Sequence, residues 1–170
     1  PLIKVLVDIE YNGVFVDKLI INNLCENLNI EISSLKSKIH QISNKEFNIN
    51  SPKQLSEVLF DDLKLKMFKK RSTSHDVLKK LVDHHPIAEY LLSYRHLNKL
   101  VNTYLDKLPT FINPITNRIH TSFHQAITST GRLSSTKPNF QNIPIKSDVG
   151  KSIRKAFKTD NNNIIISFDY

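Results

Sequence analysis

Two stripes of apolar residues set the strongest limit on how this chain can fold. In both, the apolar positions recur at alternating spacings of three and four, which places them on one face of an α-helix. The first stripe consists of Ile21, Leu24, Leu28, Ile32, Leu35, Ile39 and Ile42, and the second of Tyr90, Tyr94, Leu97, Val101, Tyr104 and Leu108. The first predicts a helix of about 26 residues, roughly 39 Å long. The second predicts a helix over 87–108, and together they predict a long antiparallel helix pair.

Shorter elements flank this pair. Residues 2–11 have helical spacing, 14–16 read as a short strand, and Asp17 is a suitable N-cap for the first long helix. Capping residues at Ser51 and at 73–76 predict two further short helices. The pattern therefore predicts a mostly helical region up to residue 108.

After Pro109 the sequence changes character. Residues 113–117 predict a hairpin-type turn, and 118–127 alternate and are rich in β-formers. Residues 149–157 predict a short basic helix, and Ile164–Phe168 predict a buried strand. The expected fold class is α+β, with a helical part followed by a β-containing part.

The composition limits the function classes. The chain has 170 residues and a formal net charge of +8, which suits contact with phosphates. A single cysteine, Cys25, excludes an internal disulfide framework and is expected in a reducing compartment. Because the sequence shows neither a signal peptide nor an apolar run long enough to span a bilayer, we expect a soluble, intracellular protein. The chain begins at Pro1 without a methionine and ends inside a predicted strand, so we expect an internal fragment.

The polar segment 128–144 concentrates hydrogen-bond donors. Gly131 is expected to let the backbone pass close to another backbone, and Arg132 offers a rigid fork of donors that stays charged. Three carboxamides follow, at Asn139, Gln141 and Asn142. Such a segment can donate to phosphate oxygens and to minor-groove acceptors. A plain polar surface loop is the alternative.

Two further basic features lie in the helical region. Residues 64–71 form a lysine-rich connector between the two capped helices, and it leads into Ser72, Thr73 and Ser74. On the second long helix, Arg95 and Lys99 share one face. Lysines and helix N-termini could together hold a duplex backbone, or the connector could be a solvated loop.

Asp169 follows the apolar run 164–168. A carboxylate at the end of a buried strand needs a cation or donors, and Mg²⁺ prefers such hard oxygen ligands. An ordinary strand-end aspartate in a turn is the alternative.

The order of residues 128–144 resembles the T-x-T-G-R-L-S-S-x-x-P-N-x-Q-N-I-P signature of family A DNA polymerases, the DNA polymerase I type. Residues 120–126 are similar to the strand that precedes this signature in the family. Residues 164–170 are similar to the opening of the catalytic D-Y-S-Q-I-E-L-R motif, and the chain stops two residues into it. The resemblance therefore covers a piece of the polymerase region.

The resemblance implies a division into parts and a set of roles. Residues 1–17 would be a lead-in helix and strand joining the palm, 18–108 the helical thumb, and 109–170 a partial palm ending at the first catalytic aspartate. Asp169 would bind metal, with Tyr170 contributing its backbone, at a site for two Mg²⁺ ions whose second carboxylate lies outside this chain. Arg132 would read minor-groove acceptors, and the three carboxamides would position primer and template. The expected duplex contacts of the thumb are Arg95, Lys99, Lys69, Lys70, Ser72, Thr73 and Ser74.

Some positions depart from the family pattern. Val101 stands where a lysine is common, Lys137 replaces an acidic residue, and the thumb tip is shorter and lacks a glycine pair. These departures remove one expected phosphate contact and put a positive charge in place of a negative one in the segment 128–144.

The expected activity of the parent protein is template-directed DNA synthesis, with primer-template DNA and dNTPs as partners. We expect a monomer that works in the bacterial cytoplasm or an organelle, is not secreted and does not bind a membrane. The fragment alone is expected to be inactive, since it holds only one metal carboxylate. The alternative is a non-catalytic helical nucleic-acid-binding module, and the residues after Tyr170 would discriminate between the two.

Overall fold

The computed structural model describes residues 2–68, 70–144, 147–159 and 163–166. The chain forms two compact units, one from residues 27–101 and one from residues 1–26 and 102–170. The sequence-based division at 17/18 and 108/109 lies nine and seven residues away from these borders and remains a prediction.

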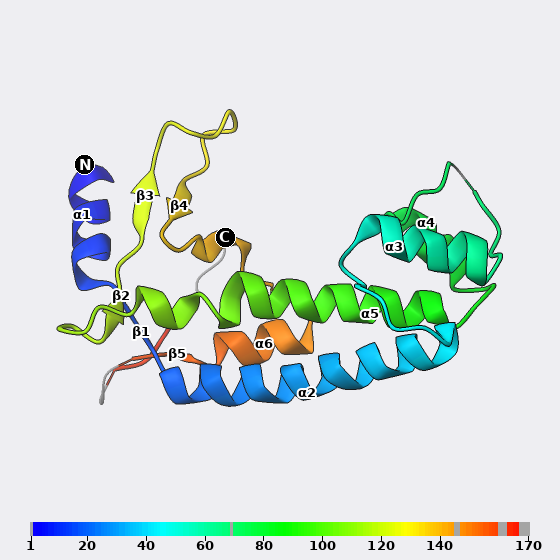
Figure 1. The fold of residues 1–170 in the computed structure, drawn as a ribbon. Helices are drawn as coiled ribbons and strands as arrows, with labels where there is room; N and C mark the ends of the chain where they lie inside the picture. The colour runs from blue at the N-terminus through cyan, green and yellow to red at the C-terminus, as the bar shows by residue number, and fades with distance from the viewer. Residues whose placement is uncertain (1, 69, 145–146, 160–162, 167–170) are drawn as a thin grey trace. The chain divides into compact units, whose positions relative to one another are not determined.

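The unit of residues 27–101 is helical. It contains the greater part of α2 (Lys18–Ser43), then α3 (Pro52–Glu57), α4 (His75–Leu81) and α5 (Ile87–Leu100). Within this unit α2 and α5 run antiparallel (Figure 1), and the Lys38 ammonium lies 5.5 Å from the centroid of the Tyr90 ring. The predicted antiparallel pair is therefore confirmed. Its core consists of side chains that are almost fully buried, among them Leu35, Ile39, Leu55, Leu59, Leu78, Leu81 and Leu91.

Capping residues start the short helices, with one difference from the prediction. The Ser51 hydroxyl accepts a hydrogen bond from the Gln54 amide at 3.4 Å, while the Gln54 side chain turns back to the Asn48 amide at 2.7 Å. Helix α4 begins after Ser74 as predicted, but the Ser74 side chain makes no capping hydrogen bond. Sequence thus located both helix starts but described the capping contact correctly only for α3.

The predicted helix over 87–108 is α-helical only up to Leu100. Helix α5 ends at Leu100 and continues as a π-helical turn, η2 (Val101–Leu105), before the 3-10 turn η3 (Leu108–Phe111). A π turn fits one more residue per turn than an α-helix. Tyr104 and Leu105, both in this turn, are buried at 9% and 1% exposure.

The described residues of the second unit form two small antiparallel sheets. One has the strand order β2-β1-β5 and consists of β1 (Val14–Val16), β2 (Arg118–Ile119) and β5 (Phe157–Lys158). The other pairs β3 (Ser122–His124) with β4 (Ser134–Thr136), and α1 (Leu2–Asn12) packs beside β3 (Figure 1). The 3-10 turn η4 (Phe140–Asn142) and helix α6 (Asp148–Arg154) complete the unit. Helix α6 was predicted from sequence, but β5 was not.

The predicted buried strand at 164–168 is wrong over its described part. Ile164, Ile165 and Ile166 are 78%, 65% and 61% exposed and have no regular secondary structure. An apolar run becomes a buried strand only when other strands pair with it, and no described segment pairs with residues 163–166. Residues 167 and 168 lie outside the described part of the chain.

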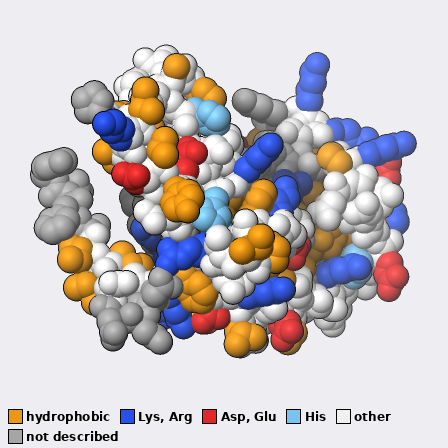
Figure 2. All heavy atoms as spheres, turned by 90° about the vertical axis from the view of Figure 1, so that its left-hand side faces the viewer, with side chains coloured by type: hydrophobic (Ala, Val, Ile, Leu, Met, Phe, Trp, Pro, Cys, Tyr) orange, Lys and Arg blue, Asp and Glu red, His pale blue; other side chains and the backbone are white. Residues whose placement is uncertain are grey.

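Helix α1 carries more apolar side chains than this unit buries. Leu6 is buried at 6% exposure, whereas Ile3, Val5, Val7 and Tyr11 are all more than half exposed. Figure 2, which views the molecule from the side where α1 lies in Figure 1, shows hydrophobic side chains at the surface among lysines and arginines. Among the described residues, none of the helices combines the length and the hydropathy needed to cross a membrane.

Asp17 joins the start of α2 to the three-stranded sheet. Its Oδ1 accepts hydrogen bonds from the Leu19 and Ile20 amides at 3.0 and 3.3 Å, which confirms the predicted N-cap. Its Oδ2 pairs with the Lys158 ammonium at 2.8 Å, and its own amide donates to the Ala156 carbonyl at 2.8 Å. The hydrogen bond from Lys158, followed by those from the backbone, lowers the pKa of the Asp17 carboxyl.

The substitution Asp17→Asn tests this joint, because Asn keeps the cap but loses the charge that Lys158 neutralises. A carboxyl whose pKa is lowered by folding stabilises the fold above its ordinary pKa, near 3.8, and this stabilisation is lost as the pH falls through the lowered value. We expect the variant to melt below the parent at neutral pH. The difference should vanish in strongly acidic solution, as thermal denaturation across this pH range would show.

Asp148→Asn is the matched control, since Asp148 also stands in the first turn of a helix and pairs with a lysine, but its side chain is 96% exposed. A smaller shift in melting temperature is expected there. A deficit of Asp17→Asn that stayed constant down to low pH would contradict the assigned role of the charge.

Candidate functional site

The polar segment 128–144 folds back on itself through its own side chains. The Asn139 Oδ1 accepts a hydrogen bond from the Gln141 amide at 3.0 Å and so caps the turn η4. The Gln141 side-chain nitrogen donates to the Leu133 carbonyl at 2.7 Å, which ties this turn to the start of β4. Two of the three predicted carboxamides therefore also shape the segment.

Donors from other elements hold further backbone carbonyls of the segment. The buried Thr121 hydroxyl lies 2.9 Å from the Thr136 carbonyl oxygen and 2.7 Å from that of Pro138. The Tyr104 hydroxyl, from η2, donates to the Asn142 carbonyl. Sequence reasoning missed both contacts, since Thr121 and Tyr104 lie far from their partners along the chain.

Gly131 and Arg132 form the exposed part of the segment. The sequence-based reason for Gly131, a close approach of another backbone, is wrong: no atom lies within 4 Å of the position that a Cβ would take. Its φ of +74° is the reason, because side chains are strained in this region. The Thr128 hydroxyl donates to the Arg132 carbonyl, and no described residue hydrogen-bonds the exposed Arg132 guanidinium. Its donors are therefore available to a ligand.

The segment thus brings Arg132, Asn139, Gln141 and Asn142 together in one unit, as the sequence predicts for a nucleic-acid contact. Asn139 and Gln141 each use one end of the carboxamide inside the protein. The Asn142 side chain is exposed, while its backbone carbonyl is held by Tyr104. Arg132, Asn142 and the amide end of Asn139 therefore keep exposed donors that no described residue uses.

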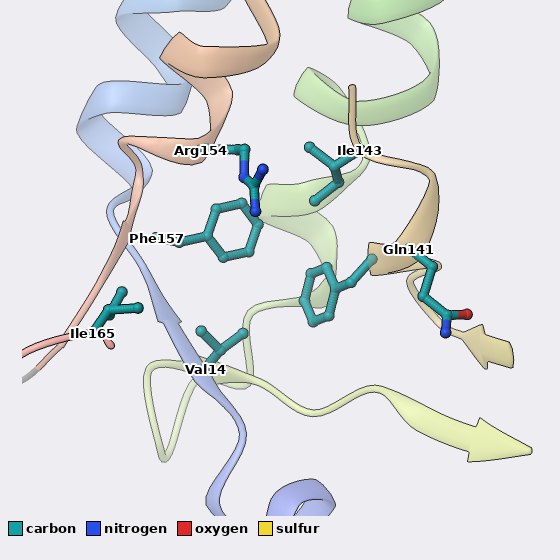
Figure 3. Close-up of a pocket in the computed structure, with 7 residues that line it drawn as sticks. Val14, Gln141, Ile143, Arg154, Phe157 and Ile165 are labelled. Carbon is teal, nitrogen blue, oxygen red and sulfur yellow. The ribbon is translucent and has the colours of Figure 1, made fainter. Parts of the chain in front are cut away.

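A mainly apolar pocket of about 510 Å³ lies beside η4 (Figure 3). The Phe140 and Phe157 rings meet edge to face in it, with centroids 5.4 Å apart. In Figure 3 the Arg154 guanidinium reaches in beside Phe157, and the Gln141 amide points away from the pocket. The remaining lining residues are Val14, Ile143 and Ile165. The pocket gives the turn η4 an apolar side opposite its hydrogen-bonding side.

The unit of residues 27–101 carries the second group of predicted contacts. The Arg95 guanidinium donates to the Thr73 carbonyl and lies 3.4 Å from the Thr73 hydroxyl. Partial burial lowers the pKa of Arg95 below its ordinary value, although a guanidinium stays charged at neutral pH. The Ser72 hydroxyl accepts from the Ser74 amide at 3.3 Å. Arg95 therefore fixes the shape of residues 72–74. This role could not be predicted from the position of Arg95 on a charged helix face.

Other cations of this unit face solvent. Lys70 and Lys99 are exposed. Near them in sequence, the Phe68 ring has the Lys66 and Lys80 ammonium groups 5.4 and 5.9 Å from its centroid. Sequence reasoning did not single out this aromatic residue, although an aromatic ring inside a lysine-rich connector is a visible signal. Lys69, Asp169 and Tyr170 lie outside the described residues.

Comparison with known proteins gives the family. A sequence profile described as DNA polymerase family A matches residues 18–170. The chain belongs to DNA polymerase family A. This family A chain is 46% identical over 173 residues to DNA polymerase I of Borreliella burgdorferi and 45% identical over 175 residues to that of Geobacillus stearothermophilus. Each match covers 100% of the chain but only 19% and 20% of the relative, so the chain spans about a fifth of the curated relatives.

A solved structure gives the same result for the fold. The chain is similar, with a TM-score of 0.80 and 37% identity, to the polymerase domain of Pol1 from M. smegmatis in complex with DNA primer-template and dNTP. The similarity covers 89% of this family A chain and 28% of that chain. The α+β fold class and the resemblance seen in residues 128–144 are thereby confirmed.

Arg95→Ala should loosen residues 72–74, because it removes a charge-assisted donor from the Thr73 carbonyl. Such a loss costs on the order of 1.5–3 kcal/mol, so amide hydrogen exchange at 72–75 should accelerate about tenfold or more. Hydrogen-exchange mass spectrometry would measure the change. Lys99→Ala is the control, since it removes the same charge one turn further along α5. Equal exchange in the two variants would show that Arg95 does not hold this segment.

Proposed function

We propose that the polymerase to which this chain belongs extends a DNA primer along a template with dNTPs. The observation that carries the proposal is the match to a solved polymerase domain bound to primer-template and dNTP, at 37% identity over 89% of the chain. The cluster of exposed donors in residues 128–144 supports the same function, because it suits a ligand rich in acceptors.

In this proposal the segment 128–144 meets the DNA near the primer end. Arg132 donates to minor-groove acceptors, which occupy similar places in all correct base pairs and so give a sequence-tolerant contact. Asn142 and the free ends of Asn139 and Gln141 position primer and template. The support is geometric: the four side chains lie on one segment, and Arg132 and Asn142 expose their donors.

The unit of residues 27–101 binds the duplex backbone in this proposal. Lys69, Lys70 and Lys99 attract phosphates directly, and Ser72, Thr73 and Ser74 offer hydroxyls and amides. Arg95 contributes chiefly by holding Thr73, since its guanidinium is already hydrogen-bonded there. Binding through such cations weakens with salt, because each phosphate contact releases a counterion.

The proposed cofactor is Mg²⁺, as two ions. The Asp169 carboxylate and the Tyr170 carbonyl are hard oxygen donors of the kind that Mg²⁺ prefers, and the second carboxylate belongs to a part of the polymerase outside this chain. When bound, the ions activate the primer 3′-hydroxyl and stabilise the leaving pyrophosphate. We further propose a monomer that works where DNA is copied, in the bacterial cytoplasm or an organelle.

Asp169→Asn in the intact polymerase tests the proposed function. The substitution keeps the shape of the side chain but removes the charge that would attract the metal, so primer extension should fall by several orders of magnitude. Primer-template affinity should change little, since Arg132 and the lysines are untouched. Extension rate and DNA affinity should be measured on the same preparation. Extension within about tenfold of the parent, a barrier change of only about 1.4 kcal/mol, would show that Asp169 is not a metal ligand.

A further inference from the structure

Tyr104 makes an interaction that the proposed function does not yet use. It lies in the π-helical turn η2, its side chain is 9% exposed, and its hydroxyl donates to the backbone carbonyl of Asn142. A carbonyl oxygen only accepts, so the contact needs the phenol proton. Burial raises the pKa of Tyr104 above its ordinary value of 10.0, so the proton is held throughout the physiological range.

The contact acts on the end of the turn η4, beyond the side-chain hydrogen bonds made by Asn139 and Gln141. Asn139 caps the beginning of this turn, and Gln141 in its middle is tied to the Leu133 carbonyl. Asn142 is the last residue of the turn, and its exposed carboxamide makes no hydrogen bond to any described residue. Its backbone carbonyl is the atom through which Tyr104 fixes its position.

Tyr104 lies in the π turn η2, from which its hydroxyl reaches this carbonyl. Tyr104 and Leu105, adjacent in this turn, are both buried. Leu105, at 1% exposure, anchors the turn in the core, while Tyr104 directs its hydroxyl to η4. π-helical turns are frequent at functional sites.

We propose that Tyr104 is a positioning residue that orients Asn142 for its contact with primer-template DNA. The proposal rests on the proposed function, since it assigns Tyr104 a role in DNA synthesis that acts through Asn142. Tyr104 itself touches neither DNA nor nucleotide in this account. Its contribution is to hold the Asn142 backbone, so that the carboxamide meets the DNA without first having to be ordered.

A double-mutant cycle on the intact polymerase tests the proposal. Tyr104→Phe keeps the buried ring and removes only the hydroxyl, and Asn142→Ala removes the carboxamide that the hydroxyl is proposed to orient. Tyr104→Phe should lower kcat/KM for primer extension about three- to tenfold, the effect of one hydrogen bond. In the Asn142→Ala background the same substitution should have almost no effect, because positioning no longer matters. Tyr94→Phe is the control, since its hydroxyl contacts Asn50 and none of the residues 128–144, and it should extend like the parent.

The possible outcomes separate the two proposals. An equal loss of kcat/KM from Tyr104→Phe in both backgrounds would mean that the hydroxyl acts through general stability. No loss of kcat/KM would mean that the hydrogen bond does not contribute to extension. Either result overturns the positioning role. Both leave the proposed function standing, provided that the unaltered polymerase extends primers. A polymerase that failed to extend any primer would overturn the proposed function and the role of Tyr104 with it.

Discussion

Hydrogen bonds from side-chain donors to backbone carbonyls keep the polar segment 128–144 in place. Apart from the pairing of β4 with β3 and the contact of Phe140 with Phe157, the segment has little apolar packing. Each hydrogen bond contributes on the order of 0.5–1.5 kcal/mol. Side-chain donors reach five of its backbone carbonyls. Within the segment, Thr128 donates to the Arg132 carbonyl and Gln141 to the Leu133 carbonyl. From outside it, the Thr121 hydroxyl lies within hydrogen-bond distance of the Thr136 and Pro138 carbonyls, and Tyr104 donates to the Asn142 carbonyl. All of these donors are neutral side chains. The charged Arg132 guanidinium is not used to hold the segment and remains available to a ligand.

In the helical unit a charged side chain donates to a backbone carbonyl in the same way. Arg95 holds the Thr73 carbonyl, whereas Lys99, one turn along the same helix, is exposed. Two cations that look equivalent on a helix face therefore differ in the structure, because Arg95 holds a backbone carbonyl whereas Lys99 is exposed to solvent. This distinction matters for reading a basic surface, because substitution of Arg95 changes both the charge and the shape of residues 72–74.

Sequence predicted local structure well and distant contacts poorly. The first apolar stripe gave a helix of about 26 residues, and α2 has 26 residues. Strand β5 was missed because its partner, β1, lies at the other end of the chain, and the contact of Tyr104 was missed for the same reason. In the apolar run 164–166 a strand was predicted where none forms. Its composition favours a strand, but these residues are exposed and no described segment pairs with them. The resemblance of residues 128–144 to a family signature could be seen in their order and is confirmed, but their internal hydrogen bonds could not be predicted.

We propose that the guanidinium of Arg132, which no described residue hydrogen-bonds, contacts the primer end in the intact polymerase. The direct measurement compares extension rates from matched and mismatched primer ends in the intact polymerase carrying Arg132→Ala, with Lys137→Ala as a control for the loss of one positive charge in the same segment. Losing a charge-assisted hydrogen bond costs about 1.5–3 kcal/mol, so Arg132→Ala should slow matched extension about tenfold to a hundredfold and narrow the difference between matched and mismatched ends. Lys137→Ala should leave that difference unchanged. A parent-like ratio of matched to mismatched rates in Arg132→Ala would contradict the account.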